Sequence, residues 1–163
     1  MNAKDVLKAD LSRARWITGM LLDDWSDEDL MVRPVPGANH TAWQLGHLIG
    51  SEHRMISAIC PGQMPALPEG FAEAYTKETA ASDNAADFHT KSEYLELYDQ
   101  QRQATMKLLE ELDEARLDEP GPEEMKQLAP TIGEIFHLAG DHEVMHHGQF
   151  SVARRAMGKP VKF

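Results

Sequence analysis

The sequence predicts an all-α fold: a four-helix bundle with a long crossover between its second and third helices. Three observations support this prediction. Apolar residues recur at helical spacing in four separate segments. Capping-box patterns, in which a threonine is followed three residues later by Glu or Gln, mark the start of three of these segments. No segment alternates in the way typical of a strand, and 163 residues are enough for a single domain over 1–163 with its own core.

The first two helices are expected on either side of a short loop. Apolar residues at helical spacing place the first over about Ala3–Asp24. A loop rich in Pro, Gly and Asn follows at 33–39. The second helix is expected from Thr41 to about Cys60, with Thr41 as the capping residue and Gln44 as its partner three positions later.

The last two helices follow a long connection. Residues 61–89 contain three prolines and then a polar stretch, and a short helix is expected within it at 70–77. A connection of this length in a compact domain is typical of a crossover or a lid. The third helix is expected over Thr90 to about Ala115. The fourth is expected over Thr131–Met157, with Gly158 as its C-cap.

Composition excludes several classes of partner. The formal net charge of −11 argues against nucleic acid, because phosphate binding needs clustered Lys and Arg. No apolar run approaches the ~18 residues of a membrane span, and no signal-peptide pattern is visible, so neither a membrane partner nor secretion is expected. Cys60 is the only cysteine, which rules out an intramolecular disulfide; we expect it to act as a small buried hydrophobe in a cytoplasmic protein.

His142 and His146 are the most informative residues of the chain. Four positions apart on a helix, they project from one face about a turn apart, close enough to bind one metal ion. A helical wheel centred on His142 places both in the middle of an apolar stripe. The stripe consists of Ile135, Leu138, Ala139, Met145, Phe150, Val152, Ala153, Ala156 and Met157. A metal ion would satisfy polar groups on such a face; a hydrogen-bonded pair of core histidines is the alternative.

The same wheel predicts the surroundings of this histidine pair. The residues predicted on the opposite, outward side are His137, His147, Arg154 and Arg155. Asp141 and Glu143 lie off the ligand face, where we expect them to be solvated or, at most, to orient an imidazole as outer-shell partners. Periodicity assigns no general acid or base.

A catalytic zinc-type centre usually needs a third protein ligand. The candidates are His40, His47, His53, His89 and His137. His47 stands out because it lies between Gly46 and Gly50, each of which costs about 1 kcal/mol relative to Ala inside a helix. Glycines there make sense where a neighbour approaches closely or a ligand needs room. Periodicity also places His47 beside Arg54 and away from the apolar stripe, so a surface histidine is an equal alternative.

Two motifs together resemble the DinB/YfiT-like superfamily: Trp-x-x-Gly-His-Leu at 43–48 and His-x-x-x-His-x-Gly-Gln at 142–149. The resemblance extends over nearly the whole chain. It includes the Arg-Pro-x-Pro-Gly-x-Asn loop ahead of the second helix and the Gly-x-Pro after the last. It implies an up-down-down-up bundle with a three-histidine metal site. His47 would be the ligand from the second helix, and His142 and His146 the pair from the fourth.

A three-histidine site leaves a divalent ion at least one open position for water or substrate. Such an ion lowers the pKa of bound water or holds a thiol as thiolate. Zn or Ni is expected, with Fe, Co or Mn as alternatives. Characterised relatives include enzymes that use a low-molecular-weight thiol such as bacillithiol or mycothiol, so the resemblance implies a small-molecule S-transferase or hydrolase. The alternatives are a non-enzymatic bundle that binds a metal or small ligand in a stress-related or sensor role, and a histidine cluster without metal.

A homodimer is the remaining expectation. The first helix carries four large apolar residues in a short stretch: Trp16, Ile17, Met20 and Leu21. Such a surplus is consistent with pairing through helix faces. The alternative is that all four belong to the core of one chain.

Overall fold

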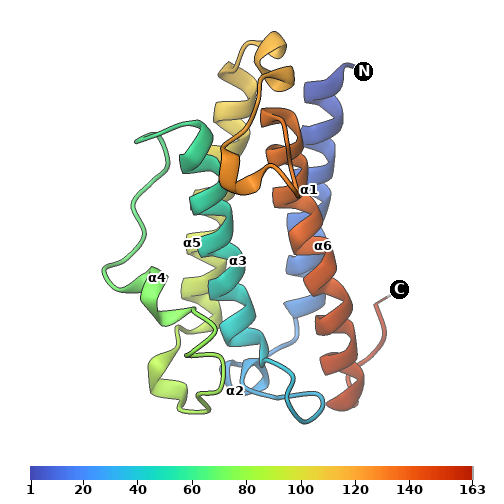
Figure 1. Ribbon diagram of the computed structural model, residues 1–163. Helices are drawn as coiled ribbons and strands as arrows, with labels where there is room; N and C mark the ends of the chain where they lie inside the picture. The colour runs from blue at the N-terminus through green and yellow to red at the C-terminus, as the bar shows by residue number, and fades with distance from the viewer. Residues whose placement is uncertain (163) are drawn as a thin grey trace.

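The computed structural model describes residues 1–162, and it confirms the all-α prediction over that range. The long helices are α1 (Ala3–Leu22), α3 (Thr41–Ile59), α5 (Lys91–Glu111) and α6 (Ile132–Ala156). Both α1 and α3 pack against α5 and α6. In Figure 1, α1 and α6 run downward while α3 and α5 run upward. The long crossover therefore joins two helices that run in the same direction.

Shorter elements lie in the connections. Helix α2 (Asp27–Leu30) follows α1, and α4 (Phe71–Ala74) lies within the crossover, where a short helix was predicted. Single 3₁₀ turns complete the connections: η1 (Ala85–Asp87), η2 (Glu114–Asp118) and η3 (Glu123–Met125). No helix within residues 1–162 is both long and apolar enough to cross a membrane.

Two of the three predicted capping boxes are present. The Thr90 side chain accepts the backbone N–H of Glu93, and the Glu93 carboxylate accepts the backbone N–H of Thr90. Thr131 and Glu134 make the same reciprocal pair at the start of α6. Each box satisfies two backbone donors that a helix start otherwise leaves free, so the sequence located both starts correctly.

The third predicted box, at the start of α3, is wrong. The capping residue is His40, whose Nδ1 accepts the backbone N–H of Trp43 at 3.1 Å. The helix therefore begins at Thr41 without using Thr41 as its cap. Gln44, the predicted partner of Thr41, makes other contacts that shape the site described below.

Helix α5 ends earlier than predicted, at Glu111 rather than about Ala115. The backbone of Leu112 is extended, with φ −65° and ψ 137°. The Asp113 carboxylate then accepts the N–H of Ala115 at 3.1 Å and begins η2. An aspartate that caps a new turn competes with continuation of the old helix.

The apolar core is divided along the bundle. One cluster forms where α1 and α6 begin and α3 and α5 end; it includes Leu11, Ile56, Leu109, Ile135 and Phe136. The other, rich in aromatic residues, lies at the opposite end and includes Leu45, Ile49, Tyr94, Tyr98 and Phe150. Buried polar side chains lie between the two clusters: Thr18, Glu52, Arg102, Glu143 and His147. We call these five residues the polar layer.

Two expectations concern residues outside this division. Cys60 is buried and free, as expected for a small hydrophobe, and burial raises the pKa of its thiol. On α1, Leu21 belongs to the core, whereas Trp16 is 63% exposed. Homodimerisation through this helix stays a prediction.

Candidate metal centre

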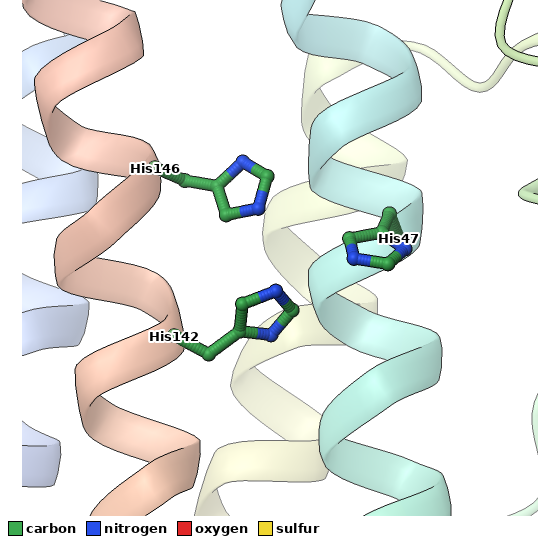
Figure 2. Close-up of side chains that lie close together, drawn as sticks. All are labelled: His47, His142 and His146. Carbon is green, nitrogen blue, oxygen red and sulfur yellow. The ribbon is translucent and has the colours of Figure 1, made fainter. Parts of the chain in front are cut away.

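Three histidines converge between α3 and α6. Figure 2 shows His142 and His146 reaching from α6 toward the side of α3 that carries His47. One ring nitrogen from each lies within 4.8 Å of the others. The ring centroid of His142 lies 5.0 Å from those of both His47 and His146. The structure thus brings together the three residues that the sequence analysis selected.

The other candidate histidines have partners elsewhere. His40 caps α3, His53 contacts Gln101 at 3.1 Å, His89 contacts the Tyr75 hydroxyl at 2.8 Å, and His137 lies 3.2 Å from Asp141. Of the five candidates for the third position, His47 is therefore the one that meets the α6 pair.

Burial keeps the three imidazoles neutral. Burial, together with the neighbouring histidines, lowers the pKa of His146 to about 3 and that of His142 to about 4. Burial, together with the positive charge of Arg54, also lowers the pKa of His47. Neutral imidazole has a free lone pair, which is the form that binds a metal ion.

Gln44 sets the tautomer of His146. Its side chain is 2% exposed, and its amide nitrogen donates to the Asn39 carbonyl at 2.7 Å. The amide oxygen must therefore be the group that faces His146 Nδ1, at 2.7 Å. Because that oxygen can only accept, Nδ1 carries the proton and Nε2 keeps its lone pair. An outer hydrogen bond of this kind orients metal-binding histidines in many proteins.

Trp43 and the crossover hold His47. The indole of Trp43 stacks on the imidazole, with centroids 4.9 Å apart and planes 8° from parallel. Its N–H donates to the Thr76 carbonyl in the crossover at 3.1 Å. Beside it, the Tyr75 ring covers Gly46 so closely that a Cβ there would lie 2.2 Å from the ring. This contact explains why the helix carries glycine next to His47.

Comparisons with known proteins identify the family of the chain. The model of the DinB superfamily matches residues 10–150, a span that holds all three histidines. The chain belongs to the DinB superfamily. A crystal structure of a conserved protein from Enterococcus faecalis is similar to this DinB-superfamily chain at 20% identity and a TM-score of 0.74, over 98% of this chain and 99% of that one. This likeness shows the fold alone. No curated protein matches the chain.

The polar layer borders the histidine cluster, because on α6 its residues Glu143 and His147 directly follow His142 and His146 in sequence. Arg102 of α5 donates to both oxygens of Glu52 at 2.9 Å and to Glu143 at 3.0 Å. It also donates to the Leu11 carbonyl of α1, so one guanidinium connects all four long helices of the DinB bundle. Glu143 also accepts from the hydroxyl of Thr18 at 2.5 Å. Burial raises the pKa of Glu143, but His147 and Arg102 outweigh it and hold that pKa below its ordinary value.

Three residues of α6 predicted on the outside are buried, and those predictions were wrong. Glu143 and His147 belong to the polar layer, where His147 Nε2 lies 2.8 Å from the Thr18 hydroxyl. Arg154 is 1% exposed and binds the Asp24 carboxylate at 2.6 Å. Buried polar groups of this kind have partners on other helices, and the periodicity of one helix cannot reveal them.

The prediction of the apolar stripe was wrong at its edge, where two apolar residues expected to be buried are exposed. Met145 and Val152 are 61% and 45% exposed, although Ile135 and Phe150 are core residues as expected. The buried face of α6 is centred near Glu143, so His142 lies at its border. A position at the border suits a metal ligand, because it is sheltered and still accessible.

The donor set of this DinB-superfamily chain fits a divalent metal ion. Three neutral nitrogens converge, one of them already oriented through its second nitrogen. Within residues 1–162 the cluster contains three side chains of the ligand type. Structural zinc sites usually take four protein ligands, whereas catalytic ones take three and leave a position open. The cluster could therefore bind a metal and still have room for a small molecule.

Proposed function

We propose that this DinB-superfamily protein binds one divalent metal ion through His47, His142 and His146 and uses it to transform a small molecule. The convergence of three neutral imidazole nitrogens within 4.8 Å carries the proposal. Imidazole ligands suit Zn and Ni best, with Fe, Co or Mn as further candidates. Three ligands rather than four favour a catalytic over a structural site.

The most concrete reaction is transfer of a low-molecular-weight thiol to an electrophile, with hydrolysis as the alternative. A metal ion held by the histidines would supply Lewis acidity, which favours the deprotonated form of a thiol or water. Gln44 holds His146 in the tautomer that presents Nε2. Trp43 shields one face of His47 from water. Glu143 is turned toward Arg102 and Thr18, so its role is to hold helices rather than to accept a proton from substrate.

Metal content tests the site directly. Protein purified without nickel resin would be analysed for metal as wild type, His47→Ala, His142→Ala and His137→Ala. The last variant is a matched control, because His137 lies on α6 with a half-exposed side chain next to Asp141. We expect about one divalent ion per chain in wild type and His137→Ala and none in the other two. Metal retained in His47→Ala would remove that residue from the site.

Thiol transfer is tested on the metal-loaded protein. The probe reaction joins a small thiol to chlorodinitrobenzene, with loss of chloride from the ring and of the thiol proton to solvent. We expect the wild type to accelerate it and His142→Ala to lose the acceleration. A protein that binds metal without accelerating this or a hydrolytic reaction would be a metal- or ligand-binding bundle instead.

A further inference from the structure

Arg54 lies on the same face of α3 as His47. The two are seven residues apart, close to two full helical turns, which places them about 10 Å apart along the axis. Gly50 lies between them, and a Cβ there would meet only the Phe71 ring, at 4.0 Å. Ser51 shares this intervening turn, so no large side chain of α3 stands between His47 and Arg54.

The face of α3 that carries His47 and Arg54 also meets the opposite helix. The ring centroid of His47 lies 5.0 Å from that of His142 on α6. Arg54 therefore lies two turns along α3 from the point where the two helices bring their histidines together.

Arg54 differs from four arginines that each bind a carboxylate from a distant part of the chain. These four are Arg15, Arg33, Arg102 and Arg154. Within residues 1–162, no carboxylate lies within 4.0 Å of the Arg54 guanidinium. In a chain with 27 acidic residues against 16 basic ones, an exposed and unpaired arginine beside a histidine cluster is available to a ligand.

We propose that Arg54 binds a carboxylate of the small molecule whose reacting end lies at the three histidines. The inference rests on the proposed function and adds to it the class of substrate, an anionic one. A guanidinium matches a carboxylate with two parallel hydrogen bonds, which gives orientation as well as attraction. Gly50 leaves room for the body of the molecule between its two ends. Arg54 is then a positioning and specificity residue.

Two small thiols of similar size test this inference by calorimetric titration of the zinc-loaded protein. 3-Mercaptopropionate carries a carboxylate, whereas 2-mercaptoethanol is neutral. The quantity of interest is the ratio of their dissociation constants in each variant, which cancels intrinsic differences between the thiols. We expect Arg54→Gln to lower the preference for the carboxylate about 5-fold, the size of a good exposed ion pair. The affinity of the Arg54→Gln variant for 2-mercaptoethanol should stay unchanged. Arg54→Lys should keep part of the preference for 3-mercaptopropionate.

Arg155→Gln is the matched control, because it removes one exposed positive charge at the far end of α6. We expect it to keep the wild-type ratio. Equal ratios in wild type and Arg54→Gln, with zinc bound in both, would overturn the role of Arg54 and leave the proposed function standing. A wild type that takes up no zinc would overturn both.

Discussion

The polar layer joins all four long helices, whereas the three-histidine cluster joins only α3 and α6, and the two sets differ in how their polar groups are satisfied. In the polar layer, Arg102 forms ion pairs with both Glu52 and Glu143. In the cluster the rings are neutral, and the hydrogen bond from His146 to Gln44 orients one of them. The first set has its partners within the protein. The second presents converging lone pairs that an external cation would satisfy.

Burial explains why both arrangements are tolerated. An isolated buried charge costs several kcal/mol, so a buried arginine needs its carboxylates. Imidazole avoids that cost by staying neutral, as the lowered pKa values of His142 and His146 indicate. Internal pairing is therefore typical of residues that hold a bundle together, whereas unpaired, converging groups are what a ligand site requires.

Arg102→Met should have the largest effect on stability. It leaves Glu52 and Glu143 buried without their cation, and removal of one partner from a buried ion pair costs about 3–5 kcal/mol. Urea unfolding of the metal-free protein would measure the loss. His142→Ala, which removes a neutral ring at the edge of the core, should cost much less in the same assay. Comparable losses would erase the distinction between the two sets.

The second-largest effect should be the pH dependence of the unfolding free energy of the metal-free protein. The pKa values of His142 and His146 are about 4 and about 3 in the folded state, against about 6.5 when unfolded. Between these values the unfolded chain binds more protons, so stability is present above about pH 6.5 and is lost as pH falls. Allowing for the partial exposure of His142, we expect about 2 kcal/mol less stability at pH 5 than at pH 7.

The double variant His142→Ala, His146→Ala provides the comparison for this pH effect. Urea unfolding in the presence of a chelator, repeated across the pH range, should give a flatter curve for the double variant than for the wild type. A wild-type curve as flat as that of the variant would show that the rings are not held neutral by burial.

Gln44→Leu should have the most specific effect, because it acts on metal binding rather than on the stability of the bundle. Loss of an outer hydrogen bond to a metal-binding histidine typically weakens metal affinity about 10–100-fold. Zinc competition with a chromophoric chelator would measure it. Thr18→Val is the matched control from the polar layer, since Thr18 bonds Glu143 and His147 rather than a ring of the cluster. We expect it to lower stability while zinc affinity stays near the wild-type value.

Local signals in the sequence were enough for the helices and for the histidine pair of α6. Thr90 and Thr131 marked their helix starts through contacts only three residues long. The spacing of His142 and His146 is equally local. His47 needed the family motif, because it lies away from the apolar core face of α3 and meets histidines of another helix.

The remaining residues of the site depend on contacts that span the chain. Glu143 and His147 look like solvated residues on a single helix, yet their partners are Thr18, 125 and 129 residues earlier, and Arg102. Gln44 fits a capping box in sequence, but its amide is used by Asn39 and by His146, 102 residues away. Sequence pattern predicts where a polar side chain lies on its own helix, not which distant group pairs with it.

The single guanidinium that joins four helices also sets their axial alignment. If α6 slid by one turn against α3, Glu143 would leave Arg102 and a carboxylate would remain buried without a cation. An apolar core alone tolerates such slippage far better, because one leucine can replace another. His47 meets His142 and His146 only when α3 and α6 are in register to within a fraction of a turn. The polar layer thus excludes the misaligned bundles in which the three rings would never meet.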